Sequence, residues 1–460
     1  MKIMFILSAT PEISAANAEL LNIRFPVMAP STTLLILAEL ARAAGNHSVE
    51  LLDTRLYMRL SAKDGEGKNW TTDYAAIEDE ILAAQPDLLG ISFMSSSAPE
   101  SYEIARLARK HGIAVIAGGL HAKVAERELI EENLFDYIYH GEAETEFGNF
   151  LKQLENGEMP PEKRHGKSRI LDGGSLPLKE MNRVPPVRDF SYYTNVMAQY
   201  ERHRPVYVEL SRGCVKNCSF CEVAKTGGAF KPFRPIPLEI IYQTVRSAVA
   251  AYDANYIQVS DSIATLHKKN FLEFMRVARA EFPQMTVQFN STVDRWDEEI
   301  AEAVSDMNCT VWFGFESGSQ KMLDFIDKGT TVEQAHRAAR LCREYNIPGG
   351  FNILLGVPGE TRDDYDETWN FFVEHPNAYP NPNILNPLPG TEMYRFCKHR
   401  NLLRNERDYR IWQAETIRKK GFTGPVLNVD YRLVLEYHGK FSGLQNEPER
   451  SLEKRRRKSG

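Results

Sequence analysis

Three cysteines within eight residues constrain this 460-residue chain more than any other feature does. In the stretch Ser211-Arg-Gly-Cys-Val-Lys-Asn-Cys-Ser-Phe-Cys221, three residues separate Cys214 from Cys218 and two separate Cys218 from Cys221. Structural zinc sites and ordinary iron-sulfur clusters take four protein ligands, so three thiolates leave one corner of a four-iron cluster open to a substrate or cofactor. Two alternatives also fit the spacing: half of a zinc site completed by a distant Cys or His, and three buried structural thiols.

The cysteines directly follow a short apolar run that is typical of a β-strand. Residues 205–210, Pro-Val-Tyr-Val-Glu-Leu, contain β-branched and aromatic side chains. The cysteine loop is therefore predicted at the carboxyl end of a strand, where α/β folds bind their ligands.

The remaining composition narrows the class of protein. Charged residues make up 26% and apolar residues 43%, a balance typical of a soluble globular protein, and a net charge of −6 gives no reason to expect nucleic-acid binding. No run of 18 apolar residues is present, so no membrane span is predicted. The other cysteines, Cys309, Cys342 and Cys397, are isolated, which argues against disulfides and favours a reducing, cytoplasmic location. The basic run at 454–458 is interpreted as a solvated tail.

The residues around the cysteines carry a family resemblance. With Arg212-Gly213 before the first cysteine and Phe220 before the last, the loop resembles the cluster loop of the radical S-adenosylmethionine (SAM) enzymes. The resemblance implies that Cys214, Cys218 and Cys221 hold a 4Fe-4S cluster whose fourth iron binds the amine and carboxylate of SAM. It also implies that one electron from the cluster cleaves SAM to methionine and a 5′-deoxyadenosyl radical.

The first 150 residues alternate strand-like and helix-like segments, which predicts a flavodoxin-like (Rossmann) doubly wound α/β domain. The predicted strands are residues 2–7, 49–52, 87–93, 114–117 and 137–139, and a helix capped by Ser31 and ended by Gly45 follows the first. Three strands end in polar or glycine-rich loops, so a ligand is expected across those ends. No Gly-x-Gly-x-x-Gly follows the first strand, which argues against a dinucleotide cofactor.

Taken in order, the loops of this region resemble the cobalamin-binding domain that precedes the barrel of many radical SAM enzymes. The loops are the serine-rich stretch 94–99, Gly118-Gly119-x-His121 and Gly141-Glu142-x-Glu144. The resemblance covers about residues 1–150 and implies cobalamin as a second cofactor. Gly118 and Gly119 are interpreted either as permitting close backbone approach to a ligand or as a tight turn.

The histidines of this region have no certain role from sequence. The loop Ser8-Ala-Thr-Pro-Glu12 contains no histidine, so the Asp-x-His-x-x-Gly ligand to cobalt found in mutase-type domains is absent. His121 is interpreted as a wall of the pocket for the nucleotide tail of cobalamin or as an ordinary hydrogen-bonded histidine. His140 is a weaker candidate for the same role.

From residue 201 to 395 strands and helices alternate again, and six strands are counted from Val206 to just before Asn386. This number matches the partial six-stranded β/α barrel of the radical SAM family. By resemblance, Ser260 and Asp261 contact the methionyl amine of SAM. The segment Glu316-Ser317-Gly318-Ser319 resembles the one whose polar residues line the methionyl and ribose site.

Two later segments extend the resemblance. Gly356-Val-Pro-Gly-Glu-Thr361 is similar to the segment that packs on adenine, and Asn386-Pro-Leu-Pro-Gly-Thr391 is another pattern of the family. Structural alternatives exist for these motifs as well. Thr361 has the position of a helix cap, and Glu316 has Lys321 and Lys328 as candidate ion-pair partners.

The predicted domains are residues 1–152 for cobalamin, a connector at 153–200, the barrel at 201–395 and a small C-terminal region with its basic tail at 396–460. Proline and glycine pairs interrupt every periodic pattern of the connector. The C-terminal region contains aromatic residues such as Tyr409, Trp412, Phe422 and Tyr431, and it is expected to cap the mouth of the barrel and help select the substrate.

The combined resemblance implies a methyltransferase that acts on an unactivated carbon through a 5′-deoxyadenosyl radical and methylcobalamin. Its expected partners are a small-molecule or lipid-like substrate and an electron donor such as flavodoxin or ferredoxin. The alternatives are a cobalamin-dependent cyclisation, ring contraction or other rearrangement, and a cobalamin sensor with an inert barrel. A methylthiotransferase is disfavoured because no cysteine precedes Cys214 to hold a second cluster.

Overall fold

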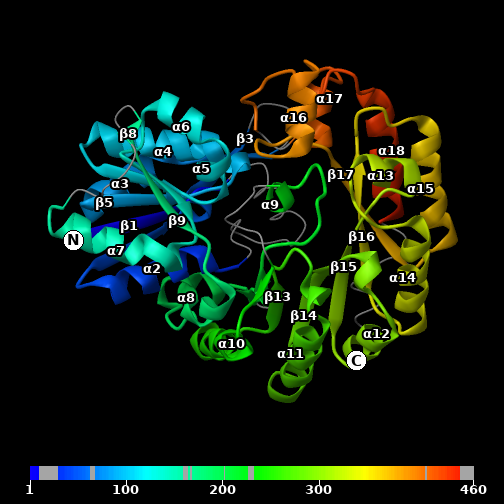
Figure 1. The fold of residues 1–460 in the computed structure, drawn as a ribbon, viewed down its shortest axis with the longest axis horizontal. Coiled ribbons are helices and arrows are strands. Elements are labelled where there is room, and N and C mark those ends of the chain that lie inside the picture. Colours follow the sequence, from blue (N-terminus) through cyan, green and yellow to red (C-terminus); the bar gives the residue numbers. More distant parts are fainter. Residues whose placement is uncertain are drawn as a thin grey trace.

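Two parallel sheets organise the chain in the computed structural model (Figure 1). The structure describes residues 1–9, 29–62, 68–158, 164–165, 168–200, 203–225, 233–409 and 412–445. Most of the Ser8–Glu12 loop and the whole basic tail lie outside these residues. In Figure 1 the blue and cyan N-terminal domain lies beside the green and yellow barrel, and helix α9 (Glu222–Lys225) lies between them.

The N-terminal sheet has the strand order β2-β1-β5-β6-β7-β9-β8. Its strands are β2 (Ser48–Asp53), β1 (Lys2–Leu7), β5 (Leu88–Ser92), β6 (Ala114–Gly118), β7 (Tyr137–Gly141), β9 (Ser168–Gly174) and β8 (Arg164–His165). The first five are parallel in the flavodoxin order 2-1-3-4-5. This order confirms the fold class that the sequence predicts.

Alternating residues of β1 build two separate cores, because successive side chains of a strand point to opposite faces. Ile3 and Phe5 pack under α2 (Thr32–Ala44) and α7 (Ala143–Glu155). Met4 and Ile6 belong to the core on the other face, which α3 (Tyr74–Ala84), α4 (Ala98–Lys110), α5 (Leu120–Val124) and α6 (Glu126–Glu132) cover. The sheet is therefore buried on both faces, and its loops meet at the carboxyl edge.

Helix α2 begins and ends where its sequence predicts. The backbone N–H of Leu34 donates to Ser31 Oγ at 3.3 Å, which satisfies one of the free N–H groups of the first turn. Gly45 follows the last turn as the C-cap residue. The local sequence is enough to set both ends.

The segment expected to be a connector adds structure to the first domain. Strand β9 pairs in parallel with β7, and β8 pairs antiparallel with β9. Helix α8 (Ser191–Met197) is tied to the end of β2, since Tyr193 Oη donates to Asp53 Oδ2 at 2.8 Å and Tyr192 Oη accepts from the Asp53 N–H at 2.9 Å. The proline and glycine pairs interrupt the periodicity without preventing these contacts.

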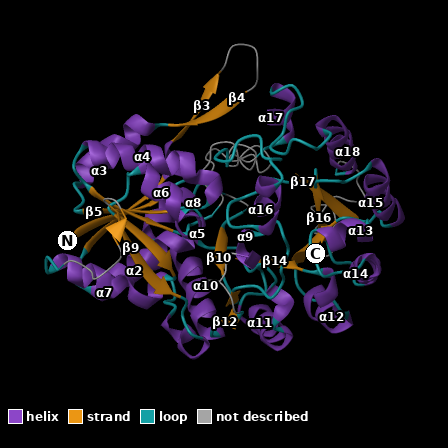
Figure 2. Cartoon of the chain, turned by 45° about the horizontal axis from the view of Figure 1, so that its top comes forward, coloured by secondary structure: helices purple, strands orange, loops and turns teal. Residues whose placement is uncertain are grey.

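A β-hairpin that the sequence reasoning did not predict follows β2. Its strands β3 (Met58–Ala62) and β4 (Lys68–Thr72) pair antiparallel, and the hairpin projects from the body of the molecule in Figure 2. Neither strand joins the large sheet. The hairpin therefore extends the surface without changing the architecture of the domain.

The second sheet contains the six predicted barrel strands, all parallel and in chain order. They are β10 (Pro205–Val208), β13 (Tyr256–Val259), β14 (Thr286–Ser291), β15 (Cys309–Glu316), β16 (Gly349–Leu355) and β17 (Ala378–Ile384). Val287 and Phe289 are buried in the core, whereas Gln288 and Asn290 between them are only partly buried. The alternation gives an apolar outside under the helices and a polar interior.

The helices outside the barrel are α10 (Leu238–Tyr252), α11 (Lys268–Glu281), α12 (Glu298–Ser305), α13 (Gln320–Phe325), α14 (Val332–Glu344) and α15 (Arg362–Glu374). Two short strands, β11 (Ser211–Arg212) and β12 (Arg234–Pro235), pair antiparallel on either side of the cysteine loop. The cysteine loop thus leaves β10 at its carboxyl end, as the sequence predicts.

The C-terminal region comprises α16 (Glu392–His399), α17 (Ala414–Lys419) and α18 (Tyr431–Leu444). Helix α18 packs beside α15 and over β17, where the Tyr437 ring stacks on Tyr365 with centroids 4.9 Å apart. Tyr409 instead reaches the first domain, where its hydroxyl donates to Glu128. The C-terminal region was expected to cap the barrel mouth. Instead, α18 packs along the last barrel strand, and Tyr409 contacts the first domain. No helix within the described ranges is long and apolar enough to span a bilayer.

Candidate active site between the two domains

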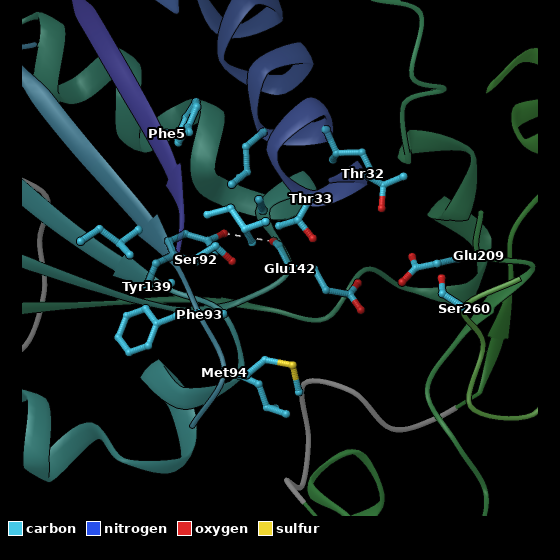
Figure 3. A pocket seen from close by; sticks show the side chains of 18 of the residues that line it. Phe5, Thr32, Thr33, Ser92, Phe93, Met94, Tyr139, Glu142, Glu209 and Ser260 are labelled. Carbon is cyan, nitrogen blue, oxygen red and sulfur yellow. Dashed lines mark hydrogen bonds between the residues drawn. The ribbon is translucent and has the colours of Figure 1, made fainter. Parts of the chain in front are cut away.

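A cavity of about 720 Å³ lies where the carboxyl ends of the two sheets face one another (Figure 3). The first domain lines it with Ser92, Phe93, Met94, Gly118, Gly119, Glu142, Ala143 and Glu144. The barrel lines it with Glu209, Ser211, Arg212, Gly213, Ser260, Asp261 and Ser262. In Figure 3, Glu209 and Ser260 enter from the side opposite Ser92 and Met94. Ligands bound by either domain could therefore reach the same cavity.

The part of the cavity within the first domain has an apolar wall. Phe5, Ile36, Ile116 and Phe147 line it, and they come from the sheet and the two helices that cover it. Such a wall suits an aromatic or aliphatic group, while the polar loops at the strand ends suit amides and phosphates. The donor set thus fits cobalamin, which carries an aromatic base, amide side chains and a phosphate.

The two adjacent glycines of the fourth strand end have different roles. A Cβ on Gly118 would meet no atom within 4 Å, so this residue opens directly onto the cavity. Gly119 has φ +87°, and its Cβ would lie 2.6 Å from the carbonyl oxygen of Phe93. Both interpretations of the glycine pair therefore hold, one for each residue: Gly118 leaves room for a ligand and Gly119 makes the tight turn.

The cysteine loop is fixed by backbone hydrogen bonds to two other parts of the barrel. The Ser219 N–H donates to the Ile326 carbonyl and the Met393 N–H donates to the Ser219 carbonyl, both at 2.8 Å. Cys214 and Cys218 are buried, and Cys221 is partly exposed. Burial raises the pKa of the Cys218 thiol to about 11, although the nearby Lys328 ammonium acts in the opposite direction.

The three thiol sulfur atoms of the loop are not gathered around one point, as the ligands of a single metal ion would be. Two sulfur atoms that both bind one zinc ion at about 2.3 Å lie at most about 4.6 Å apart. Across the described chain, only His336, Glu374 and His375 bring three such ligand atoms within 4.8 Å of one another. Cys214, Cys218 and Cys221 do not form such a group.

The Glu316 carboxylate lies next to the cysteine loop in an unusual backbone conformation. Glu316 has φ +70°, and β15 shifts its register against β16 between Gly314 and Glu316. Its Oε1 lies 2.7 Å from Lys328 Nζ, and both side chains are buried. Lys328 also lies over the Phe220 ring, 5.8 Å from its centroid. Of the two lysines considered from sequence, Lys328 is the partner, and strain of this kind is typical of functional sites.

Asp261 joins the end of the second barrel strand to the strand that precedes the cysteines. It accepts a hydrogen bond from the Leu210 N–H at 2.6 Å and another from Ser211 Oγ. Burial raises the pKa of Asp261 to about 7, against the effect of these two donors. Ser260 is exposed in the cavity, and its Oγ donates to the Val208 carbonyl at 3.0 Å.

The two serines after Glu316 form hydrogen bonds with α15 inside the barrel wall. Ser319 Oγ donates to Asp364 Oδ1 at 2.7 Å, and the Gly318 N–H donates to Thr368 Oγ1 at 2.9 Å. Ser317 and Ser319 are almost fully buried. A Cβ on Gly318 would lie 2.6 Å from the Thr368 backbone, so a glycine is required for this close packing. These serines fix the strand end to α15 and do not line the cavity.

The motif at residues 356–361 also stabilises the barrel locally. Thr361 caps α15, and its side chain and Asp364 form a capping box. Glu360 Oε2 accepts from the N–H groups of Gly356 and Val357 at 2.8 and 3.1 Å. The alternative interpretation of Thr361 as a helix cap is therefore the one that the geometry supports.

Two acidic residues after β7 form ion pairs with the barrel. Glu144 Oε1 lies 2.7 Å from Arg212 Nη2, and Glu142 pairs with Arg234 on β12. In the sequence, these glutamates stand out only as part of the Gly141-Glu142-x-Glu144 motif, and no pattern indicates a role for Arg234. Their roles depend on groups about 70 to 90 positions away, which no local pattern reveals.

Neither candidate histidine of the first domain lines the cavity. His140 Nε2 lies 3.0 Å from the Ala122 carbonyl, and burial lowers its pKa. His121 is fully buried and lies 3.0 Å from both Ser95 Oγ and Tyr102 Oη. The hydrogen-bonded alternative therefore describes His121 better than the pocket wall does.

Known proteins agree with this two-domain arrangement. The B12 binding domain model matches residues 20–151, and the radical SAM superfamily model matches residues 208–372. An uncharacterized methyltransferase of Pyrococcus horikoshii is 26% identical over 415 residues, which cover 88% of this chain and 85% of that protein. Bacteriochlorophyllide d C-8(2)-methyltransferase of Chlorobaculum tepidum is 24% identical over 401 residues, which cover 85% and 81%.

One further relative and one solved structure complete the comparison. The anaerobic magnesium-protoporphyrin IX monomethyl ester cyclase of Cereibacter sphaeroides is 24% identical over 344 residues, covering 70% of this chain and 56% of that protein. The methyltransferase TsrM of Kitasatospora setae, solved with cobalamin and a 4Fe-4S cluster, matches with a TM-score of 0.67 at 18% identity. The match covers 86% of this chain and 75% of TsrM, and it establishes the shared fold. The chain therefore belongs to the radical SAM enzymes whose barrel is preceded by a B12 binding domain.

Proposed function

We propose that this enzyme methylates an unactivated carbon of a small molecule. The observation that carries the proposal is the single cavity shared by the carboxyl ends of both sheets (Figure 3). A substrate placed there would contact the cobalamin domain on one side and the SAM side of the barrel on the other. When bound, the cofactors would supply a methyl group and a 5′-deoxyadenosyl radical, and the protein would supply position and exclusion of water.

In this proposal, Cys214, Cys218 and Cys221 hold the 4Fe-4S cluster. The position of the loop at the carboxyl end of β10 and the backbone bonds that fix Ser219 support the assignment. The loop remains close to the surface, because Val215 is 51% exposed. This exposure supports electron delivery by an external donor protein such as a flavodoxin or ferredoxin.

Ser260, Asp261 and Glu316 are proposed to bind SAM. Ser260 and Asp261 line the cavity directly beside the start of the cysteine loop. A carboxylate at Asp261 or Glu316 is suited to accept hydrogen bonds from an ammonium group or a ribose. Lys328 would keep the Glu316 carboxylate oriented, since the two side chains are paired 2.7 Å apart.

Gly118 and the apolar wall around Phe5 and Phe147 are proposed to accept cobalamin. The substrate would then occupy the remaining space toward Glu209 and Ser262. A cavity of this size with mixed polar and apolar walls is compatible with small-molecule and lipid-like substrates.

The test is a methyl-transfer assay with anaerobically reconstituted enzyme, hydroxocobalamin, a reductant and SAM that carries a deuterated methyl group. We expect 5′-deoxyadenosine and S-adenosylhomocysteine to form together, and a candidate substrate to gain one labelled methyl group by mass spectrometry. Cys218→Ala should abolish both products, while Cys342→Ala, which alters a buried thiol of α14, should retain them. Full activity of the Cys218→Ala enzyme would overturn the proposal.

A cobalamin-dependent cyclisation is the second candidate, and the similarity to the Cereibacter sphaeroides cyclase favours it. The same assay separates the two reactions. A cyclase would form 5′-deoxyadenosine without S-adenosylhomocysteine, and its product would contain no labelled methyl group.

A further inference from the structure

A buried chain of hydrogen bonds joins the cysteine loop to the first domain. Glu222 directly follows Cys221, and its Oε1 accepts from Ser95 Oγ at 2.7 Å. Ser95 Oγ also lies 3.0 Å from His121 Nδ1. Ser95 and His121 are fully buried and Glu222 is 7% exposed, so water does not replace these contacts.

This series of buried hydrogen bonds continues into the C-terminal region. His121 Nε2 lies 3.0 Å from Tyr102 Oη, which in turn donates to Glu128 Oε1 at 2.8 Å. Glu128 Oε2 accepts from the Tyr409 hydroxyl. A single buried network therefore connects the cluster loop, the cobalamin domain and the segment after α16.

The centre of this network is rigid and uncharged. Burial lowers the pKa of His121 to about 3, so its imidazole is neutral at physiological pH. The ring packs against Phe93 and Tyr409, with centroids 5.4 and 5.3 Å away. Aromatic neighbours on two sides hold the ring in one orientation, and each nitrogen meets one partner.

The turn that carries Ser95 touches both cofactor sites. This 3₁₀ turn (Ser95–Ser97) follows Met94, and Met94, Ser96 and Ser97 all line the cavity. Ser95 points away from it, toward Glu222. Val223, the residue after Glu222, lines the cavity from the barrel side. A ligand in the cavity would therefore contact the 3₁₀ turn on one face, while the other face of the turn is hydrogen-bonded to Glu222 beside the cysteine loop.

A contribution to folding stability is not a sufficient explanation for this buried network. Burying a carboxylate with hydrogen-bonding groups stabilises a protein no more than packing apolar residues of the same volume. A buried polar network does favour one relative placement of the segments that it joins, because a shift of either segment would break hydrogen bonds that water cannot replace. The network is thus suited to setting the position of the cysteine loop against the cobalamin domain.

We propose that Glu222, Ser95 and His121 are positioning residues that transmit occupation of the cobalamin cavity to the cysteine loop. The inference rests on the proposed function, since it takes the ligand of the cavity to be cobalamin. Coupling between two sites is reciprocal, so loading of the cluster should also strengthen cobalamin binding.

The experiment is hydrogen–deuterium exchange of cluster-loaded enzyme with and without hydroxocobalamin, together with a titration of its affinity. In the wild type, hydroxocobalamin should slow exchange both at residues 94–97 and at residues 211–223. In Ser95→Ala the protection at 211–223 should be lost and the affinity should fall at least about fivefold, the lower end of typical coupling between sites. Glu222→Gln keeps an acceptor for Ser95 and should restore most of the protection that Glu222→Ala loses.

The matched control is Ser101→Ala, another fully buried serine, whose Oγ donates to the Ser97 carbonyl within the same domain at 2.8 Å. It should keep both protections and the affinity. Tyr409→Phe removes one hydroxyl from the far end of the network and serves as the second test if Ser95→Ala does not fold. Its expected effect is a partial loss of protection at 211–223.

Two results would overturn the inference in distinguishable ways. Unchanged protection at 211–223 and unchanged affinity in both Ser95→Ala and Glu222→Ala would show that the network does not transmit occupation. Failure of the wild-type enzyme to bind hydroxocobalamin at all would overturn the proposed function itself.

Discussion

The guanidinium of Arg234 forms a forked ion pair with the carboxylate of Glu142, with Nη2–Oε1 and Nη1–Oε2 distances of 2.7 and 2.9 Å. Arg234 also donates to the Leu176 carbonyl at 2.6 Å, and the Leu176 N–H donates back to Glu142 at 2.8 Å. Arg234 is 1% exposed and Glu142 is 5% exposed. The pair therefore joins the barrel to the cobalamin domain and to the segment between them in an environment that excludes water.

Removal of the arginine should destabilise the enzyme strongly. In Arg234→Met the buried Glu142 carboxylate would lose its forked partner and keep Arg212, at 3.8 Å, as its nearest cation, so the cost should approach the roughly 3–5 kcal/mol of a broken buried pair. Thermal unfolding should show a midpoint several degrees lower. Arg246→Gln breaks an exposed pair with Glu281 and should leave the midpoint unchanged. Equal midpoints for Arg234→Met and wild type would contradict the role given to the ion pair.

Lys328→Met should reduce retention of the cluster. The change leaves Glu316 buried beside the cysteine loop without its partner and removes the cation that lies over Phe220. Iron and sulfide content after anaerobic reconstitution should fall severalfold. Lys321→Met is the control, because Lys321 is exposed and its partner Asp364 keeps the bonds from Ser319 and Thr361. Normal iron content in Lys328→Met would exclude this supporting role.

The contribution of Asp261 to the stability of the cofactor-free enzyme should fall as the pH rises from about 4 to about 7. Burial raises the pKa of Asp261 to about 7 from its ordinary value of 3.8, so between these values the folded state binds more protons than the unfolded state. The stabilisation is complete below the unfolded pKa and is lost as the pH passes through the folded pKa. Its size is on the order of 4 kcal/mol.

Asp261→Asn removes this titration and keeps one oxygen acceptor, for the Leu210 N–H, while its amide NH2 can donate to Ser211 Oγ in place of the oxygen that now accepts from it. Unfolding midpoints of the variant should therefore depend less steeply on pH between 4 and 7 than those of the wild type. Parallel pH profiles for the two proteins would show that Asp261 titrates normally.

The two glycines at the end of β6 should respond oppositely to substitution. A Cβ on Gly118 meets no atom within 4 Å, so Gly118→Leu should fold normally but fill the cavity and weaken hydroxocobalamin binding at least about tenfold. Gly119→Ala should instead lower the unfolding midpoint, since φ is +87° and the new Cβ would lie 2.6 Å from a backbone oxygen. Affinity titration and thermal unfolding measure the two effects separately. Unimpaired hydroxocobalamin binding by a folded Gly118→Leu enzyme would place cobalamin elsewhere.

Much of the local structure could be predicted because it depends on neighbours in sequence. Side-chain period and strand composition indicated both sheets, and the caps at Ser31 and Thr361 satisfy N–H groups only three residues away. The capping box at Thr361 and the Glu316–Lys328 pair were both foreseen as structural alternatives, and both occur. The hairpin β3–β4 and the strand β9 were not predicted, because Gly173-Gly174 and weak periodicity hide their pairing.

By itself, the sequence determined the class of protein: the spacing of Cys214, Cys218 and Cys221, followed by polar strand ends in a fixed order, is a local pattern and survives without any tertiary information. Only the tertiary structure decided what joins the two domains. Arg234 meets Glu142 across 92 positions, and Glu222 meets Ser95 across 127. Contacts at such separations depend on how two folded sheets dock. The direction in which His121 points, into the protein and away from the cavity, follows from its partners Ser95 and Tyr102 within the first domain and from no motif around it.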